Sequence, residues 1–62
     1  MKRHAAQSGT RDEVLAELRD SAEGWPRMGR DDLGEAAKQA AVAIAAGETS
    51  VSVGHIVYTV TD

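Results

Sequence analysis

Residues 48–61 alternate between apolar and polar side chains on both sides of Gly54-His55, which is the pattern of a β-hairpin. Glycine at the first position of a two-residue loop supplies the positive φ of a type II′ turn. Counting outward from the turn predicts the pairs Val53–Ile56, Val51–Tyr58 and Thr49–Val60 on an apolar face, and Ser52–Val57, Ser50–Thr59 and Glu48–Thr61 on a hydroxyl-rich face. A slip of one residue would turn the apolar set to solvent, so the pattern favours this register.

A first helix is predicted over residues 11–23. Thr10 and Glu13 have the spacing of a capping box, in which the two side chains bind backbone donors at a helix start. The apolar residues that share one face at helical spacing are Val14, Leu15, Leu18 and Ala22. Glu13, Glu17 and Asp20 lie on the opposite, acidic face.

Residues 24–29 read as a connector, because Pro26 disfavours helix at Trp25 and a glycine stands at each end. We expect Trp25 and Met28 to fold back over one end of the core.

A second helix is predicted from Asp31 or Asp32 to about Ala46, with a weaker capping box at Asp32-x-x-Glu35 and Gly47 as its left-handed cap. Its predicted core stripe consists of Leu33, Ala36, Ala37, Ala40, Ala41 and Ile44. Val42 points away from that stripe.

The expected fold is α+β, with two helices packed on the C-terminal antiparallel hairpin in the order helix, helix, strand, strand. Residues 1–9 lack periodicity and are expected to form a flexible basic tail, which leaves residues 10–62 as one compact domain. Both edges of a lone hairpin would be unpaired, and edge pairing of two copies would give a four-stranded sheet in a homodimer.

Composition supports a single small domain with a sparse core. The chain has 62 residues, no Cys and no Phe, so disulfides cannot supplement the core and oligomerisation is the expected supplement. No apolar run has the length of a membrane span and no signal-peptide pattern is visible, which favours a cytoplasmic protein.

The charge is +3 over residues 1–11, −4 over 12–23, +2 over 24–30 and −4 over 31–62. Acids on helices favour a solvated surface or a basic protein partner over non-specific nucleic-acid binding.

Catalytic and ligand-binding motifs are weak. His4 and His55 have no companion at metal-ligand spacing, and no nucleophile-elbow pattern surrounds any Ser. Gly24-x-x-x-x-Gly29 has the glycine spacing of a phosphate loop but is followed by Arg30-Asp31 instead of Lys-Ser/Thr. We therefore expect no enzyme, no metal site and no cofactor.

The leading hypothesis is a small non-catalytic interaction protein that binds and modulates or inhibits a larger protein or assembly. In size and composition it resembles the compact accessory proteins of phages and mobile elements. The residues predicted to contact partners are Glu13, Glu17, Asp20, Trp25, Arg27, Arg30 and Val42. The alternative is a nucleic-acid-binding regulator in which Arg27 and Arg30 contact phosphate and Trp25 stacks on a base, with the basic tail assisting.

Overall fold

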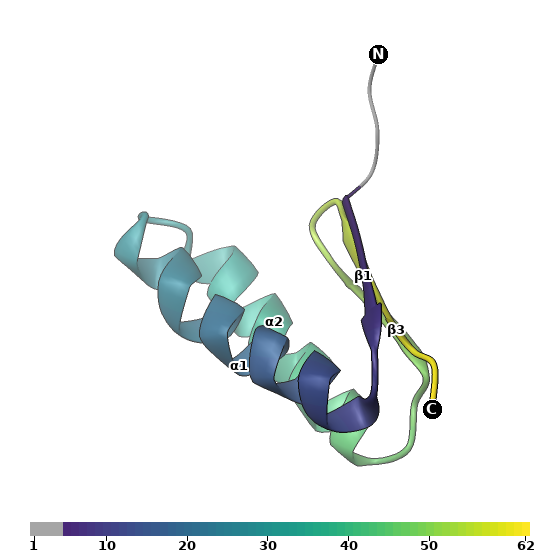
Figure 1. Ribbon diagram of the computed structural model, residues 1–62. Coiled ribbons are helices and arrows are strands. Elements are labelled where there is room, and N and C mark those ends of the chain that lie inside the picture. Colours follow the sequence, from purple (N-terminus) through teal and green to yellow (C-terminus); the bar gives the residue numbers. More distant parts are fainter. Residues whose placement is uncertain (1–4) are drawn as a thin grey trace.

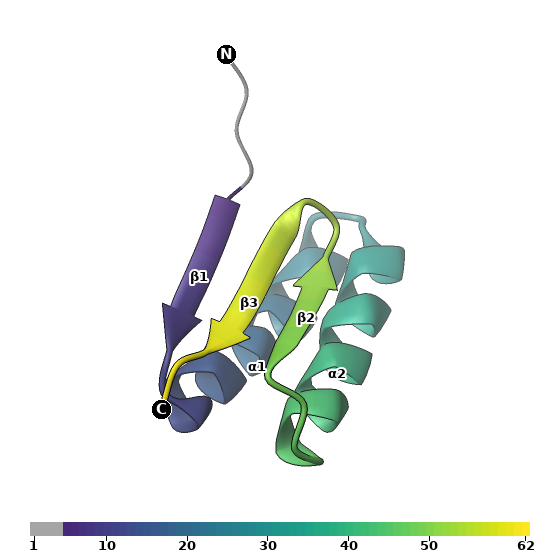
Figure 2. The same ribbon diagram turned by 90° about the vertical axis from the view of Figure 1, so that its right-hand side faces the viewer.

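The computed structural model describes residues 5–62 and shows two helices packed on one face of a three-stranded mixed sheet (Figure 1). The elements in chain order are β1 (Ala5–Gly9), α1 (Arg11–Arg27), α2 (Asp31–Ala45), β2 (Ser50–Val53) and β3 (Ile56–Val60). The sheet order is β1-β3-β2, so the last strand lies in the middle (Figure 2). The α+β class predicted from sequence is confirmed.

The hairpin of β2 and β3 has the predicted register. The structure pairs Ser50 with Thr59, Val51 with Tyr58, Ser52 with Val57 and Val53 with Ile56. The N–H of Val60 donates to the carbonyl of Thr49 at 2.8 Å, which continues the ladder by one pair. Gly54 has a φ of 60°, and no non-glycine residue in the described range has a positive φ. These angles agree with the predicted type II′ turn and exclude type I′, which would need a positive φ at His55 as well.

Strand β1 corrects the predicted order of elements. Residues 5–9, expected in a tail, pair in parallel with β3, and the N–H of Thr61 donates to the carbonyl of Gly9 at 2.8 Å. The predicted Glu48–Thr61 pair is not part of the sheet, because β2 begins at Ser50 and β3 ends at Val60. The segment Ala5–Gly9 has no strand-like alternation and is held by a partner far away in sequence, so local pattern could not reveal it. Residues 1–4 of the predicted tail lie outside the described range.

The four-stranded dimer sheet was predicted from a two-stranded hairpin with both edges unpaired, and the structure has three strands instead. The chain itself covers the outer edge of β3 with β1, and the unpaired edges belong to β1 and β2. Pairing of two copies would join three-stranded sheets instead of two-stranded hairpins.

Helix α1 begins as predicted and ends later. The N–H of Thr10 donates to Glu13 Oε1 at 2.9 Å, and the N–H of Glu13 donates to Thr10 Oγ1 at 3.2 Å, which completes the capping box. The helix then continues through Pro26 to Arg27, so most of the predicted connector is helical. It ends in a Schellman motif at Gly29, whose φ is 81°. Proline in the last turn removes one helical bond, and its ring lies against Gly34 of α2.

Helix α2 begins at Asp31 without the predicted side-chain cap. Its N-cap residue is Arg30, so Asp32 lies inside the first turn and cannot form the Asp32-x-x-Glu35 capping box. The end agrees with prediction: Gly47 has a φ of 118°, and its N–H donates to the carbonyl of Ile44 at 3.1 Å.

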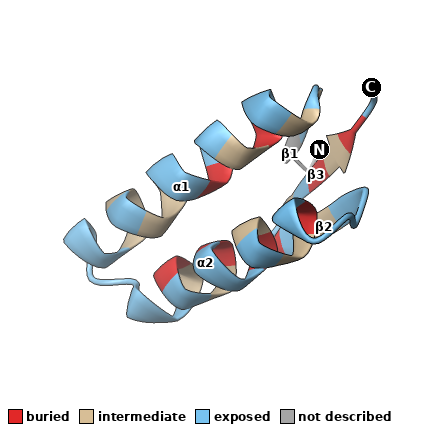
Figure 3. Ribbon diagram, turned by 90° about the horizontal axis from the view of Figure 1, so that it is seen from below, coloured by how far each residue is buried: buried red, intermediate tan, exposed pale blue. Residues whose placement is uncertain are grey.

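The core lies between the two helices and the inner face of the sheet (Figure 3). Its buried apolar members are Val14, Leu18, Ala37, Ala40, Ile44, Val53, Tyr58 and Val60. The predicted helix faces are confirmed, since Leu15, Ala22, Leu33, Ala36 and Ala41 pack around this core. The predicted lid of Trp25 and Met28 does not form: Trp25 is half-buried but is not among the side chains packed on the core, and Met28 is 69% exposed.

The two helices lie close together where Gly34 meets Pro26. Gly34 is buried, and a Cβ built on it would lie 2.7 Å from Pro26 Cγ and 3.2 Å from the carbonyl oxygen of Ala22. Carbon atoms in contact are normally about 3.5–4.0 Å apart, so only glycine fits at this crossing.

Candidate interaction surfaces

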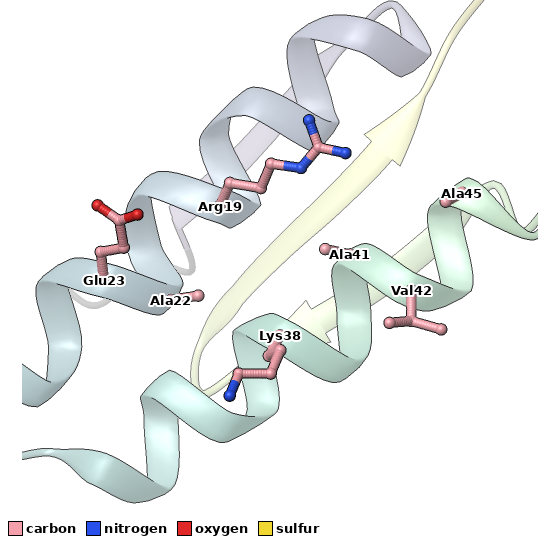
Figure 4. Close-up of a pocket in the computed structure, with 7 residues that line it drawn as sticks. All are labelled: Arg19, Ala22, Glu23, Lys38, Ala41, Val42 and Ala45. Carbon is pink, nitrogen blue, oxygen red and sulfur yellow. The ribbon is translucent and has the colours of Figure 1, made fainter.

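An open groove runs between α1 and α2 on the side turned away from the sheet (Figure 4). Its volume is about 580 Å³, and its lining consists of Arg19, Ala22, Glu23, Lys38, Ala41, Val42 and Ala45. Ala22 and Ala41 point into the space between the helices, while Arg19 and Glu23 stand on α1 and Lys38 on α2. The groove has an apolar floor of small side chains between charged rims.

Val42 is the large apolar side chain that lines this groove, on the side of α2 turned away from α1 (Figure 4). It is 61% exposed, as the sequence predicted from its position off the core stripe. Within residues 7–62, Met28 and Val57 are the other exposed large apolar side chains, and neither lines the groove. The rim carries both signs of charge, with Arg19 and Lys38 positive and Glu23 negative. Lys38 also lies 3.8 Å from Glu35 in an exposed ion pair.

A smaller hollow of about 300 Å³ lies where the end of the helix pair meets the hairpin turn. Its lining consists of Trp25, Arg30, Leu33, Val53, Gly54, His55 and Ile56. The guanidinium of Arg30 at its rim pairs with Asp32, with Nε 3.4 Å from Oδ1. The hydrogen bond from this guanidinium holds the pKa of the Asp32 carboxyl below its ordinary value. The positive charge of Arg30 is thus partly balanced within the chain.

The predicted acidic face of α1 is exposed at Glu13, Glu17 and Asp20. Glu13 has a structural role as well, because its carboxylate accepts the N–H of Thr10 in the capping box. The ion pairs among residues 5–62 are Arg30–Asp32 and Lys38–Glu35, so Glu17 and Asp20 have no described cation within 4.0 Å. Of the three acids, Glu17 and Asp20 therefore have no ion-pair partner within the part of the chain that the structure describes.

The structure distributes the seven predicted partner residues over separate surfaces. Trp25 and Arg30 line the hollow, Val42 lines the groove, and the three acids form the other side of α1. Arg27 is exposed at the end of α1 and lines neither depression. Sequence reasoning missed the remaining groove residues. The signal that could have found them is the alanine-rich pattern of two helices joined by a short turn, which places Ala22 and Ala41 on facing sides.

Polar side chains in the core region serve the fold. Ser21 Oγ and Tyr58 Oη lie 3.2 Å apart and link α1 to β3. The guanidinium of Arg11 donates to the carbonyls of Ile44, at 2.6 Å, and Glu48, at 3.0 Å, which ties the start of α1 to the end of α2.

Within the described part of the chain, no group of three or more His, Cys, Asp or Glu side chains is arranged to hold a metal ion. Neither α1 nor α2 is long and apolar enough to cross a membrane.

Comparison with known proteins finds no matching family model, no matching curated protein and no matching solved structure. The functional argument therefore rests on the surfaces described above.

Proposed function

We propose that this protein is a small, non-catalytic interaction protein that binds and modulates a larger protein through the groove between α1 and α2. The observation that carries the proposal is the exposed Val42 beside an apolar floor, on the face of the helix pair that the sheet does not cover. Apolar surface rimmed by charged side chains is typical of a binding site.

The shape of the groove suits a helix of the partner. Two antiparallel helices with alanines between them form a shallow channel, and ridges of a third helix can enter such a channel. From Lys38 to Ala45 the groove follows α2 for about two turns, or roughly 11 Å at the helical rise. A partner helix would therefore present apolar anchors at i, i+3 or i+4, and i+7. Its flanks would carry acids near Arg19 and Lys38 and a base near Glu23.

A matched pair of substitutions tests this proposal. Val42→Lys places a charge on the groove, whereas Met28→Lys places the same charge on a more exposed apolar residue outside it. Both sites are exposed, so each substitution should change the free energy of unfolding by less than about 0.5 kcal/mol. We expect a partner recovered from the native host with the unmodified protein to be lost with Val42→Lys and retained with Met28→Lys. Equal behaviour of the two variants would contradict the proposal.

Nucleic-acid binding is the alternative, and the shared hollow of Trp25 and Arg30 is the observation in its favour. The ion pair between Arg30 and Asp32 and the separate position of Arg27 weaken it. A nucleic-acid complex should weaken steeply as salt rises because bound counterions are released, whereas an apolar helix interface should not. Titration of single-stranded DNA at two salt concentrations separates the two hypotheses.

A further inference from the structure

The outer edge of β1 is an unpaired strand edge. The carbonyl of Gly9 accepts the N–H of Thr61, so the backbone groups of Gly9 are turned toward β3. Backbone groups of successive strand residues point to opposite sides, and those of Ser8 and Ala6 are therefore directed away from the sheet. An edge of this kind is a template for another strand.

No helix covers the inner side of β1 at Gln7. Gln7 is the register partner of Tyr58, whose side chain is buried under α1, yet Gln7 itself is exposed. Figure 2 shows the reason: α1 leaves the lower end of β1 and passes behind β3. Strand β1 and the adjacent side of α1 therefore form an open corner.

The wall of this corner is acidic. Glu13, Glu17 and Ser21 lie on one face of α1 at successive turns. Glu13 contacts the end of β1 through the capping box at Thr10, and Ser21 contacts Tyr58 on β3. Glu17 lies between these two anchors along α1, and Asp20 lies next to it on the side of α1 turned away from the core. Because Glu17 and Asp20 have no described cation within 4.0 Å, they give the corner a negative charge.

We propose that this edge binds an extended basic segment of a partner protein, which adds a strand beside β1 and directs alternate Lys or Arg side chains to Glu17 and Asp20. Side chains on one face of a strand recur every second residue, about 7 Å apart, which allows successive bases to reach successive acids. Their aliphatic stems would cover the inner side of β1.

The corner is separate from the groove, because Arg19 and Glu23 occupy the other side of α1. The inference therefore does not depend on the proposed helix-binding function, and substitutions at Val42 leave it untouched.

A peptide of alternating lysine and threonine is the probe, and amide chemical shifts of the full, isotope-labelled chain are the measurement. We expect binding that shifts the amides of Gln7 to Gly9 and of Glu17. The same peptide with N-methyl groups on alternate residues should bind at least about tenfold more weakly, because it cannot pair its backbone. Equal binding of the N-methylated peptide, shifts confined to the groove, or no binding at millimolar peptide would overturn the proposal.

Three variants separate the strand edge from general electrostatics. Glu17→Gln with Asp20→Asn should weaken peptide binding about tenfold at low salt and less at high salt, whereas Glu23→Gln should leave it unchanged. Glu13 is kept, because its substitution would disturb the helix cap. Ser8→Pro removes one outward N–H and should weaken binding; thermal melts establish that each variant is folded. Unchanged affinity in the Glu17→Gln, Asp20→Asn variant would refute the proposed charge contacts, even if Ser8→Pro fails to fold.

Discussion

Gly34→Ala should destabilise this protein even though alanine is the better helix former. Gly34 lies inside α2 at the point where it crosses α1, and its added Cβ would be 2.7 Å from Pro26 Cγ and 2.8 Å from Pro26 Cδ. The proline ring is fixed to the backbone and cannot rotate away. The backbone oxygen of Ala22 would lie 3.2 Å from the same added Cβ, so the Cβ is also in tight contact with the backbone of α1. The helices must therefore separate by about 1 Å to regain a normal carbon contact distance.

The magnitude follows from two opposing contributions. Replacing glycine by alanine in a helix interior stabilises by about 1 kcal/mol. Overpacking a tight contact costs about 1–3 kcal/mol, and the upper value applies here because the atoms it meets belong to a ring and to the backbone. We therefore expect a net loss of about 2 kcal/mol, or a fall in Tm of roughly 8–16 °C for a domain of this size.

Thermal and urea denaturation followed by circular dichroism measure this loss, and Gly24→Ala is the matched control. Gly24 lies inside α1, and beyond its chain neighbours and the backbone of its own helix nothing lies within 4 Å of an added Cβ, so Gly24→Ala should raise stability by about 0.5–1 kcal/mol. Adding Pro26→Ala to Gly34→Ala should recover part of the loss, because the ring that causes the clash is gone. If Gly34→Ala were as stable as Gly24→Ala, the close crossing of the helices would be wrong.

Three further predictions concern the turn, the groove and a surface carboxyl. Gly54→Val should lower the free energy of unfolding by about 1–2 kcal/mol in urea melts, because Gly54 has a φ of 60°, whereas His55→Ala should have little effect. If the chain self-associates through the groove, sedimentation at micromolar concentration should show a dimer that Val42→Lys dissociates; a monomer at all concentrations would contradict this. The depressed pKa of Asp32 should return toward its ordinary value in Arg30→Gln, as NMR titration would show. The interaction of Arg30 with Asp32 stabilises the fold above the unfolded-state pKa of Asp32. This stabilisation is lost as the pH falls through the folded-state pKa.

The hairpin and both helix faces could be predicted because each is encoded by neighbouring residues. The turn at Gly54-His55 fixes the register of β2 on β3 by counting alone. The capping box of Thr10 and Glu13 and the glycine cap at Gly47 satisfy backbone groups within a few residues, so they too are visible in sequence.

The features that escaped prediction depend on contacts between distant segments. Strand β1 forms because β3 supplies an edge for it, and α1 continues past Pro26 because Gly34 of α2 accepts the ring. Local preference at Pro26 favours the end of a helix, and tertiary packing overrides it. The groove was not predicted for the same reason. The sequence places Val42 off the core stripe, but which residues of α1 line the groove with it depends on the packing of the two helices.

The central position of β3 has a consequence for how the chain assembles during synthesis. Strands β1 and β2 pair only with β3 and not with each other, although both precede it in the sequence. Until β3 has left the ribosome, the nascent chain can form its helical hairpin but no part of its sheet. Translation arrest before residue 56 would therefore leave two partnerless strands beside a half-covered helix pair, a species suited to chaperone binding or aggregation.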